Sequence, residues 1–227
     1  MSFTFGRFIC IEYMKEKIKI DIVSDVVCPW CIIGYKYLEK AIIALGIENQ
    51  VAIAWQPFEL NPTMPKEGQN ITAHISEKYG ATLEQQAASK RNMTEVGAKL
   101  DFKFDYFDEM RMVNTFDAHI LLEYAGTFDK QTELTMRFTT AFFSERKDVS
   151  NRDVLKQALL DVGLNAEEGI SKLENETARN EIRTKQEYWK SLGVHSVPTI
   201  VFNKKSAVTG AQPVATFKEI LSELIAE

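Results

Sequence analysis

The 227-residue chain contains only three cysteines, three histidines and six prolines, and it has no long run of apolar residues. Three cysteines are too few for the disulfide framework of a small secreted scaffold. Since no apolar run approaches the length that crosses a bilayer, we expect no membrane partner. Residues 1–14 lack the continuous apolar segment of a signal peptide, so the cytoplasm is the expected compartment.

The chain also lacks an excess of positive charge, because it has 27 Lys and Arg residues and 32 Asp and Glu residues, which gives a net charge of −5. No basic block occurs, and this balance argues against a nucleic-acid partner. Hydrophobic residues make up 45% of the chain, which at this length is enough for a sizeable core. We therefore expect an ordinary globular protein, either a monomer or a homodimer.

Residues 1–14 are expected to form an N-terminal tail outside the fold. Met14 directly precedes a charged triplet and the first predicted strand, which makes it a candidate alternative start. Cys10 would then be an exposed thiol of the tail.

The stretch Asp25–Cys31 joins a strand pattern to a helix pattern through two cysteines. Before it, Lys17–Ile22 alternates polar and apolar residues, which indicates a strand. After it, apolar and small residues recur at helical spacing as far as Leu45, and Gly46 stands at the usual stop position. The cysteines are therefore expected where a strand passes into a helix.

This position has a chemical consequence for Cys28. Pro29 suits the first turn of a helix, which places Cys28 at or next to the N-cap, facing the positive end of the helix dipole. A thiolate is favoured there, and the thiolate is the form that attacks disulfides. Cys31, one turn further on, is placed to resolve the mixed disulfide, and Trp30 is expected to cover the site. We interpret the pair as a redox-active dithiol.

The remaining pattern predicts the fold class. Val51–Trp55 indicates a second strand, Thr199–Asn203 and Ala207–Thr209 indicate a hairpin, and a last helix starts near Pro213. Between the two ends, residues 69–192 carry almost wholly helical signals. The order β-α-β … β-β-α predicts an α/β thioredoxin fold with a long all-helical insertion, in which residues 15–68 and 193–227 form one domain and residues 69–192 another.

Several helix starts can be predicted inside the insertion. Thr82 with Gln85 resembles a capping box, Asn114 is expected to cap a helix that ends at Gly126, and Ser150 with Asp153 is expected to open another. Residues 101–106 alternate but are expected to be an extended connector outside the main sheet. The phenylalanines Phe138, Phe142 and Phe143 are interpreted as core of the insertion, or in part as lining of a substrate groove.

Five motifs resemble those of the DsbA-like thioredoxin superfamily, and within it the FrnE-like cytoplasmic branch. They are Cys28-Pro29-Trp30-Cys31, Phe58-Glu59-Leu60-Asn61-Pro62, Asn114-Thr115-Phe116-Asp117-Ala118-His119, Gly193-Val194-His195-Ser196-Val197-Pro198-Thr199 and Gly210-Ala211-Gln212. The resemblance covers nearly all of the chain beyond Met14.

The resemblance implies a thiol–disulfide oxidoreductase with Cys28 and Cys31 as its catalytic pair. It also implies a cis peptide bond between Val197 and Pro198 beside the dithiol. The backbone of Val197 would then be free to pair with an extended substrate, and Pro29, Trp30, Val197 and Pro198 would shape the contact surface.

Two departures from the family pattern stand in the sequence. Ser196 occupies a position where FrnE-like proteins often have glycine, although serine is also small and suits a turn. Some relatives carry a further cysteine pair near the C-terminus, and this chain has none, so a relay through such a pair is not expected.

The cysteine pair and the histidines also have plainer interpretations. A zinc site would need two more ligands, and the chain offers only His74, His119 and His195, scattered along it, so we expect no metal. His119 is interpreted as a packed or hydrogen-bonded residue of a helix face rather than as a catalyst. His195 is expected in the turn before Pro198, either at the border of a cleft or in solvent.

The leading hypothesis is an enzyme that reduces, isomerises or oxidises protein or peptide disulfides, without a cofactor and with glutathione as a candidate redox partner. The alternative is a glutathione-dependent isomerase or transferase of the hydroxychromene-carboxylate isomerase or kappa-class type, which shares the inserted layout. Those relatives usually have serine at the position of Cys28. A third hypothesis is a peptide-binding chaperone with a vestigial dithiol.

Overall fold

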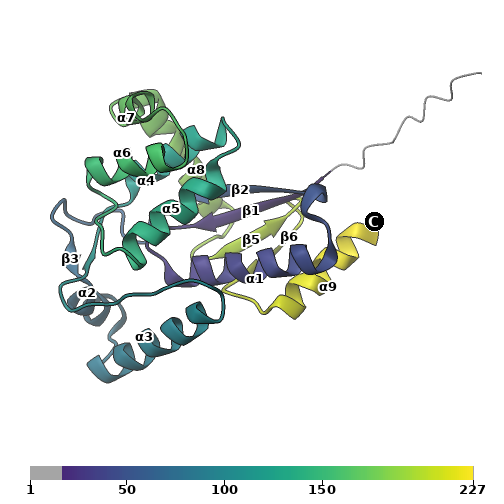
Figure 1. The fold of residues 1–227 in the computed structure, drawn as a ribbon, viewed down its shortest axis with the longest axis horizontal. Coiled ribbons are helices and arrows are strands. Elements are labelled where there is room, and N and C mark those ends of the chain that lie inside the picture. Colours follow the sequence, from purple (N-terminus) through teal and green to yellow (C-terminus); the bar gives the residue numbers. More distant parts are fainter. Residues whose placement is uncertain (1–16, 227) are drawn as a thin grey trace, which may run out of the picture.

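A four-stranded sheet built from both ends of the chain forms the centre of the fold (Figure 1). The structure is a computed structural model that describes residues 17–226. Strand β1 (Ile18–Ser24) pairs in parallel with β2 (Val51–Pro57) and antiparallel with β5 (Thr199–Phe202), which pairs antiparallel with β6 (Ser206–Thr209). The strand order β2-β1-β5-β6 confirms the predicted β-α-β unit and the C-terminal hairpin.

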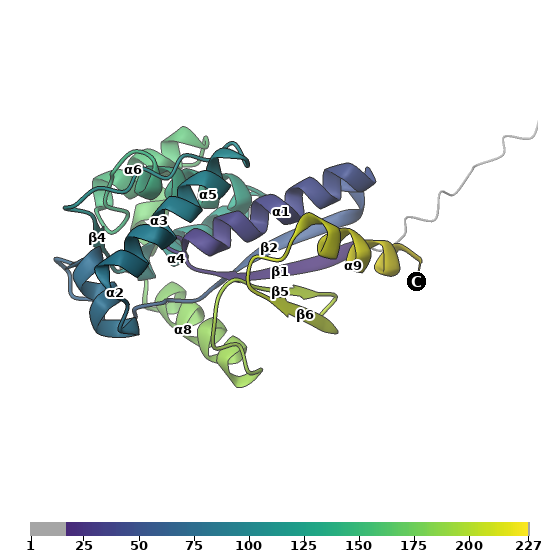
Figure 2. The same ribbon diagram turned by 90° about the horizontal axis from the view of Figure 1, so that it is seen from below.

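Two helices cover one face of this sheet. Helix α1 (Pro29–Leu45) connects β1 to the short 3-10 turn Glu48–Gln50 and to β2, and it lies beside α9 (Val214–Ala226) (Figures 1 and 2). Helix α1 ends as predicted at Gly46, whose φ of 65° places it in the left-handed region that glycine accepts without strain. Both helices therefore come from the two chain ends that form the sheet.

Strand β1 is buried on both faces, as the central strand of a covered sheet should be. Ile20 and Ile22 belong to the main core, whereas Val23 packs in a second cluster with Trp189 and Val201. Helix α8 (Glu176–Ser191) supplies Trp189 and lies on the face opposite to α1 (Figure 2). A helix of the predicted insertion thus packs directly on the sheet, and the proposed division at residues 68 and 193 stays a prediction.

The segment between β2 and β5 carries seven helices in the described part of the chain. They are α2 (Ile71–Tyr79), α3 (Leu83–Ala98), α4 (Phe116–Gly126), α5 (Gln131–Phe143), α6 (Arg152–Asp161), α7 (Ala166–Lys172) and α8. In Figure 1, α2 and α3 lie below the start of α1, and α4 to α7 gather above it. The start of α1 therefore lies between two groups of insertion helices.

The insertion is not entirely helical, which differs from the prediction. Strands β3 (Gln69–Asn70) and β4 (Arg111–Met112) pair antiparallel over two residues each. A Cβ atom on Gly68 would lie 2.5 Å from the carbonyl oxygen of Met112, and Gly68 has a φ of 66°. Two residues are too few for a period-two pattern, so the alternation rule could not detect this pairing.

Two predicted helix starts need correction. The side chain that caps α6 is Asn151, whose Oδ1 accepts the N–H groups of Asp153 and Val154, whereas the Ser150 hydroxyl bonds to Asp148. Asn114 lies one residue before the N-cap of α4 and accepts the N–H of Phe116. Asn and Ser have similar N-cap preferences, so neighbouring candidates cannot be ranked from sequence. The capping box of Thr82 and Gln85 at α3 is confirmed.

The phenylalanine cluster of α5 is core, because Phe138, Phe142 and Phe143 are each at most 3% exposed. Phe142 also borders a surface pocket together with Phe107 and Arg146, so its part in a substrate groove stays a prediction. Phe102 and Phe104 of the extended connector pack edge-on against Phe143. The connector pairs with no strand of the main sheet, as predicted.

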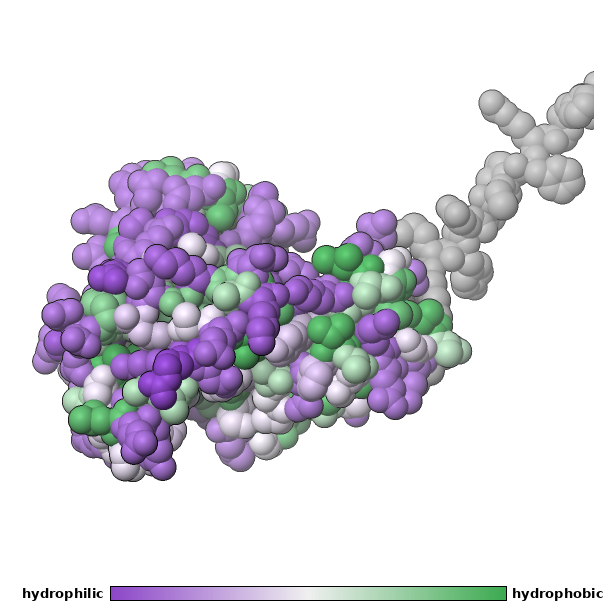
Figure 3. Space-filling model, turned by 60° about the horizontal axis from the view of Figure 1, so that its bottom comes forward, coloured by the Kyte–Doolittle hydropathy of each residue, from purple (hydrophilic) through white to green (hydrophobic). Residues whose placement is uncertain are grey.

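The face of the molecule seen in Figure 3 is mostly hydrophilic, and its hydrophobic residues gather mainly towards the right end. Within residues 17–226 no helix combines the length and the apolar character that a membrane span requires. The predicted tail of residues 1–14, with Cys10 and the candidate start Met14, lies outside the described residues.

Candidate active site

Cys28 lies at the N-cap of α1, as predicted. The chain leaves β1 at Ser24 and turns, and the N–H of Cys28 donates to the carbonyl oxygen of Asp25 at 3.0 Å. Cys28 has an extended backbone with φ −94° and ψ 111°, and Pro29 is the first helical residue. No side chain caps this helix end. Cys28 therefore lies at the N-terminus of a 17-residue helix, which is the positive end of the helix dipole.

Cys28 and Cys31 are both free thiols, and both are buried, with 4% and 1% of their surface exposed. Burial raises the pKa of Cys31 well above the ordinary value for a thiol, and the neighbouring Cys28 sulfur raises it further. Hydrogen bonds from the Asp25 backbone and the Ser24 side chain act in the opposite direction but do not cancel these effects. Cys31 is therefore a protonated thiol at neutral pH.

The loop before β5 meets the dithiol from the other end of the chain. The thiol of Cys28 donates to the carbonyl oxygen of Val197, 3.9 Å away. The Val197–Pro198 peptide bond is cis, Pro198 is buried and Val197 is half-buried. The N–H of Gly210, from the end of β6, donates to the carbonyl oxygen of Pro198 at 2.8 Å. The structure thus brings Cys28, Val197 and Pro198 together.

Gly34 permits this close approach. A Cβ atom at Gly34 would lie 3.2 Å from Cγ of Pro198 and 3.4 Å from Cα of Ala211. The first distance is shorter than most van der Waals contacts of side chains, so alanine at this position would displace the loop or the helix. In the sequence Gly34 is one of the small residues at helical spacing before Leu45, and its approach to Pro198 becomes visible only in three dimensions.

Trp30 and Pro29 lie at the outer edge of the site. Trp30 is 39% exposed, the largest exposure among the four residues of the motif, and Pro29 is half-buried. An indole ring beside the N-terminus of α1 gives the site an apolar, solvent-facing border.

A buried acid, Asp25, lies beneath the turn that carries Cys28. The carboxylate of Asp25 is 1% exposed, and its Oδ2 accepts the N–H of Leu60 at 2.7 Å. Leu60 packs with Val197 against the second core cluster, so this bond connects the loop after β2 to the dithiol turn. Lys78 of α2 donates to the carbonyl oxygen of Leu60 and is influenced by the charge of Asp25.

Two tyrosines of the insertion also lie within electrostatic reach of the dithiol. Burial of Tyr106 and the partial desolvation of Tyr79 raise the pKa of each phenol, and the charge of Cys28 raises both further. Tyr79, the last residue of α2, is 61% exposed. The insertion therefore borders the site on the side of α2.

The three histidines of the chain lie in different places. His119 of α4 is buried, with Nε2 at 3.6 Å from Oδ1 of Asp25. His74 of α2 is buried between Gln69 and Asn61, and burial lowers its pKa. His195 is exposed in the turn before Pro198. His119 is packed as expected, but its position beside Asp25 was not predicted.

No group of three or more His, Cys, Asp or Glu side chains suited to a metal ion occurs within residues 17–226. The dithiol itself offers two sulfur atoms at a helix end. Two thiols one turn apart can form and break a disulfide, and they can do so without a bound group.

The sheet order and the dithiol at the start of α1 together define a protein of the thioredoxin-fold class. The chain belongs to the DSBA-like thioredoxin domain family, whose model matches residues 19–222.

Individual proteins are similar to this chain in sequence or in fold. A probable DsbA oxidoreductase from Streptomyces coelicolor is 29% identical, with a TM-score of 0.86 over 92% of this chain and 91% of that one. The uncharacterized protein YwbO of Bacillus subtilis (strain 168) is 25% identical over 91% of this chain and 96% of its own length. The cytosolic disulfide reductase DsbM from Pseudomonas aeruginosa, solved with GSH, is 15% identical, with a TM-score of 0.61 over 92% of this chain and 100% of that one.

Proposed function

We propose that the protein is a thiol–disulfide oxidoreductase that acts on protein or peptide disulfides. The observation that carries the proposal is the pair of free thiols at the start of α1, with Cys28 at the N-cap and its sulfur against the carbonyl oxygen of Val197. Membership of the DSBA-like thioredoxin domain family is consistent with this chemistry.

In the proposed reaction the thiolate of Cys28 attacks one sulfur of a substrate disulfide. A bond forms between Cys28 and that sulfur, and the second substrate sulfur leaves as a thiolate. Cys31 then loses its proton and attacks the sulfur of Cys28, which releases the first substrate sulfur. The substrate gains two electrons, and the enzyme is left with a Cys28–Cys31 disulfide that a thiol reductant must reduce.

The substrate contact surface is proposed to consist of Pro29, Trp30, Val197 and Pro198. Val197 presents its carbonyl oxygen next to Cys28, where the backbone of an extended peptide could pair with it. Trp30, which is partly exposed two residues after Cys28, provides apolar contact area.

We propose the cytoplasm as the compartment and reduction or isomerisation as the direction. Glutathione is the proposed redox partner, and the fold shared with a cytosolic disulfide reductase solved with GSH is in keeping with this choice. A reducing compartment keeps an enzyme's dithiol in its reduced form, which favours electron flow from Cys28 and Cys31 to the substrate.

A glutathione-dependent isomerase or transferase would use the same fold differently. Such an enzyme needs one group to activate the thiol of glutathione and has no use for a resolving thiol. The presence of Cys31 directly behind Cys28 therefore favours the redox function. If Cys31→Ala left a glutathione-conjugating or isomerase activity intact, the alternative would be preferred.

The test is the reduction of insulin by dithiothreitol, followed as turbidity. Cys28→Ser is expected to abolish the acceleration that the wild-type protein gives, because the hydroxyl cannot form a mixed disulfide. Cys10→Ser is the matched control, since it removes a cysteine outside the dithiol and should leave the rate unchanged. Equal rates for the wild type and Cys28→Ser would refute the proposal.

A further inference from the structure

Asp25 and His119 form a buried pair whose facing atoms lack hydrogen-bond partners. Oδ1 of Asp25 and Nε2 of His119 lie 3.6 Å apart, and neither has a partner within the described residues. The residues are 1% and 3% exposed. A carboxylate oxygen and an unprotonated ring nitrogen are both acceptors, so the arrangement is satisfied only when a proton lies between them. We assign that proton to Nε2 of His119, which leaves the other ring nitrogen able to accept a second one.

The same region borders the buried thiol that must lose a proton. Cys31 is 1% exposed, and burial and the Cys28 sulfur keep its pKa well above the ordinary value. Its sulfur interacts with the Ser24 side chain. A thiol in this environment reacts slowly as a nucleophile at neutral pH unless a nearby base takes its proton.

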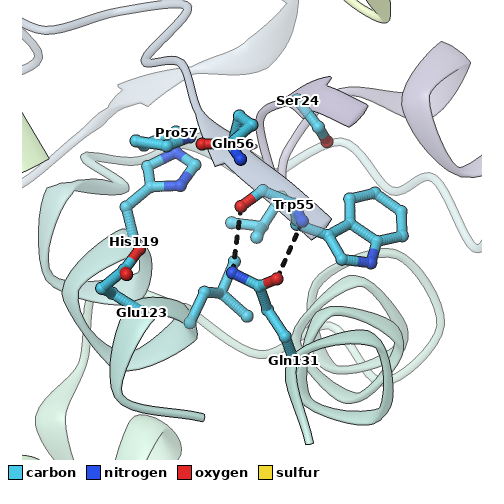
Figure 4. A pocket seen from close by; sticks show the side chains of 9 residues that line it. Ser24, Trp55, Gln56, Pro57, His119, Glu123 and Gln131 are labelled. Atoms are coloured by element: carbon cyan, nitrogen blue, oxygen red, sulfur yellow. Dashed lines mark hydrogen bonds between the residues drawn. The ribbon is translucent and has the colours of Figure 1, made fainter. Parts of the chain in front are cut away.

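Ser24 and His119 both line a small cavity, on opposite sides of β2 (Figure 4). Its volume is about 10 Å³, which is about the space that one water molecule occupies. Ser24 comes from the end of β1, His119 and Glu123 come from α4, and Gln56 of β2 lies between them. The Gln56 amide is bonded to Asp21 and Trp189, and Glu123 is paired with Lys185, so Ser24 and His119 are the two groups of the proposed relay that can hydrogen-bond to a water there.

The charged groups around the pair are few. Lys78 of α2 faces Asp25, and Glu123 lies one turn beyond His119 in an ion pair with Lys185 of α8. On the side of the dithiol, the Asp25 backbone and the Ser24 side chain both hydrogen-bond to the Cys31 sulfur. With Asp25 beside it, a protonated His119 would form a buried ion pair rather than an isolated buried charge.

We propose that Ser24, His119 and Asp25 form a relay that removes the proton from Cys31 during the resolving step. This inference rests on the proposed redox function and adds a helix of the insertion to the reaction. The Cys31 proton passes to the Ser24 oxygen, and the Ser24 hydroxyl proton passes through a water in the cavity to the free ring nitrogen of His119. The Asp25 carboxylate stabilises the resulting imidazolium, as in other acid–imidazole pairs.

The resolving step follows the loss of the Cys31 proton. The Cys31 thiolate attacks the Cys28 sulfur, the bond between Cys28 and the substrate sulfur breaks, and the substrate leaves as a thiolate. Two thiols of the enzyme become one disulfide while one substrate disulfide becomes two thiols. The proton on His119 returns through the cavity to solvent or to the departing thiolate.

The test separates the two chemical steps. In a Cys31→Ala background only the attack by Cys28 occurs, and its rate can be followed by mass spectrometry of the mixed disulfide. With Cys31 present, resolution is followed by rapid quenching and alkylation between pH 6 and pH 10. In the wild type we expect resolution at neutral pH, whereas His119→Gln should slow resolution about 100-fold at pH 7 and leave the attack rate unchanged.

The pH profile distinguishes a proton relay from a structural role. The deficit of His119→Gln should shrink as the pH approaches the raised pKa of Cys31, because the thiol then ionises without the relay. Ser24→Ala leaves the Asp25–His119 pair intact and should show the same pH-dependent loss of the resolution rate. This variant provides the test if His119→Gln does not fold. His195→Gln, an exposed histidine outside the relay, should match the wild type.

An equal loss at every pH, or no loss of resolution in either variant, would overturn the relay. If the attack by Cys28 were itself absent in the Cys31→Ala background, the proposed function would fail instead. The two failures are therefore distinguishable.

Discussion

The thiol of Cys28 and the carbonyl oxygen of Val197 lie 3.9 Å apart although the two residues are separated by 169 positions in the chain. The contact depends on β1 and β5 being neighbours in the sheet, since Cys28 follows β1 and Val197 precedes β5. All of the helices of the insertion lie between these two points in sequence. The site is therefore a product of sheet topology as much as of the cysteine motif.

Gly34→Ala is expected to lower the rate of insulin reduction roughly tenfold, because misplacement of reacting groups by fractions of an ångström already slows a reaction. The new Cβ atom would press on Pro198 at 3.2 Å and move the Val197 loop relative to Cys28. Stability should change little, since alanine also favours the helix. Gly126→Ala is the control, because its Cβ atom would meet only ordinary contacts at 3.6 Å or more. Equal activities of both variants would contradict the expected role of Gly34.

Acid should weaken the fold in part through Asp105. Hydrogen bonds from Arg146 and Lys103 lower the pKa of this carboxyl to about 2. Because the pKa in the unfolded chain is near 3.9, the contribution of Asp105 is fully present above about pH 4 and is lost as the pH falls towards about 2.

The measurement is urea unfolding of wild type and Asp105→Asn at several pH values between 6 and 2. The difference in their free energies of unfolding should decline as the pH falls from about 4 to about 2. Arg146→Gln should reproduce part of the effect, since it removes the strongest hydrogen-bond donor to Asp105. A difference that stays constant down to pH 2 would show that Asp105 acts through something other than its charge.

The corrected cap of α6 can be checked with two neighbouring substitutions. Asn151→Ala should lower the free energy of unfolding by about 1 kcal/mol, because it removes the side chain that accepts the N–H groups of Asp153 and Val154. Ser150→Ala should change it by less than about 0.5 kcal/mol, since Ser150 is outside the helix and bonds only to Asp148. Urea midpoints in the reverse order would restore Ser150 as the cap.

The cysteine end of the site could be predicted from sequence because its signals are local. A period-two strand, a proline in the first helical turn and a glycine at the helix end stand within 30 residues of one another, and each was confirmed in α1 and β1. The loop of Val197 and Pro198 was expected near the dithiol only because the motifs resemble a known family.

The buried part of the site could not be predicted in the same way. Asp25 and His119 come from segments 94 positions apart, and nothing in the composition of either segment shows that α4 would place an imidazole beside the dithiol turn. The position of Asp25 directly after a buried strand was only a weak indication that its carboxyl is buried. Acidic side chains are rarely fully buried unless they are paired, and the sequence does not show the partner. The pairing of β3 with β4 was missed for a related reason, because it is too short to leave a periodic pattern.

The central claim, that Cys28 forms a covalent bond with its substrate and Cys31 resolves it, is tested most directly by trapping. Cys31→Ala incubated with a disulfide-containing peptide should accumulate an adduct on Cys28 that dithiothreitol releases, and mass spectrometry of the intact protein and its fragments locates it. The double variant Cys28→Ser/Cys31→Ala should form none. A bound peptide that separates without a reductant, or an adduct on Cys10 alone, would contradict the claim.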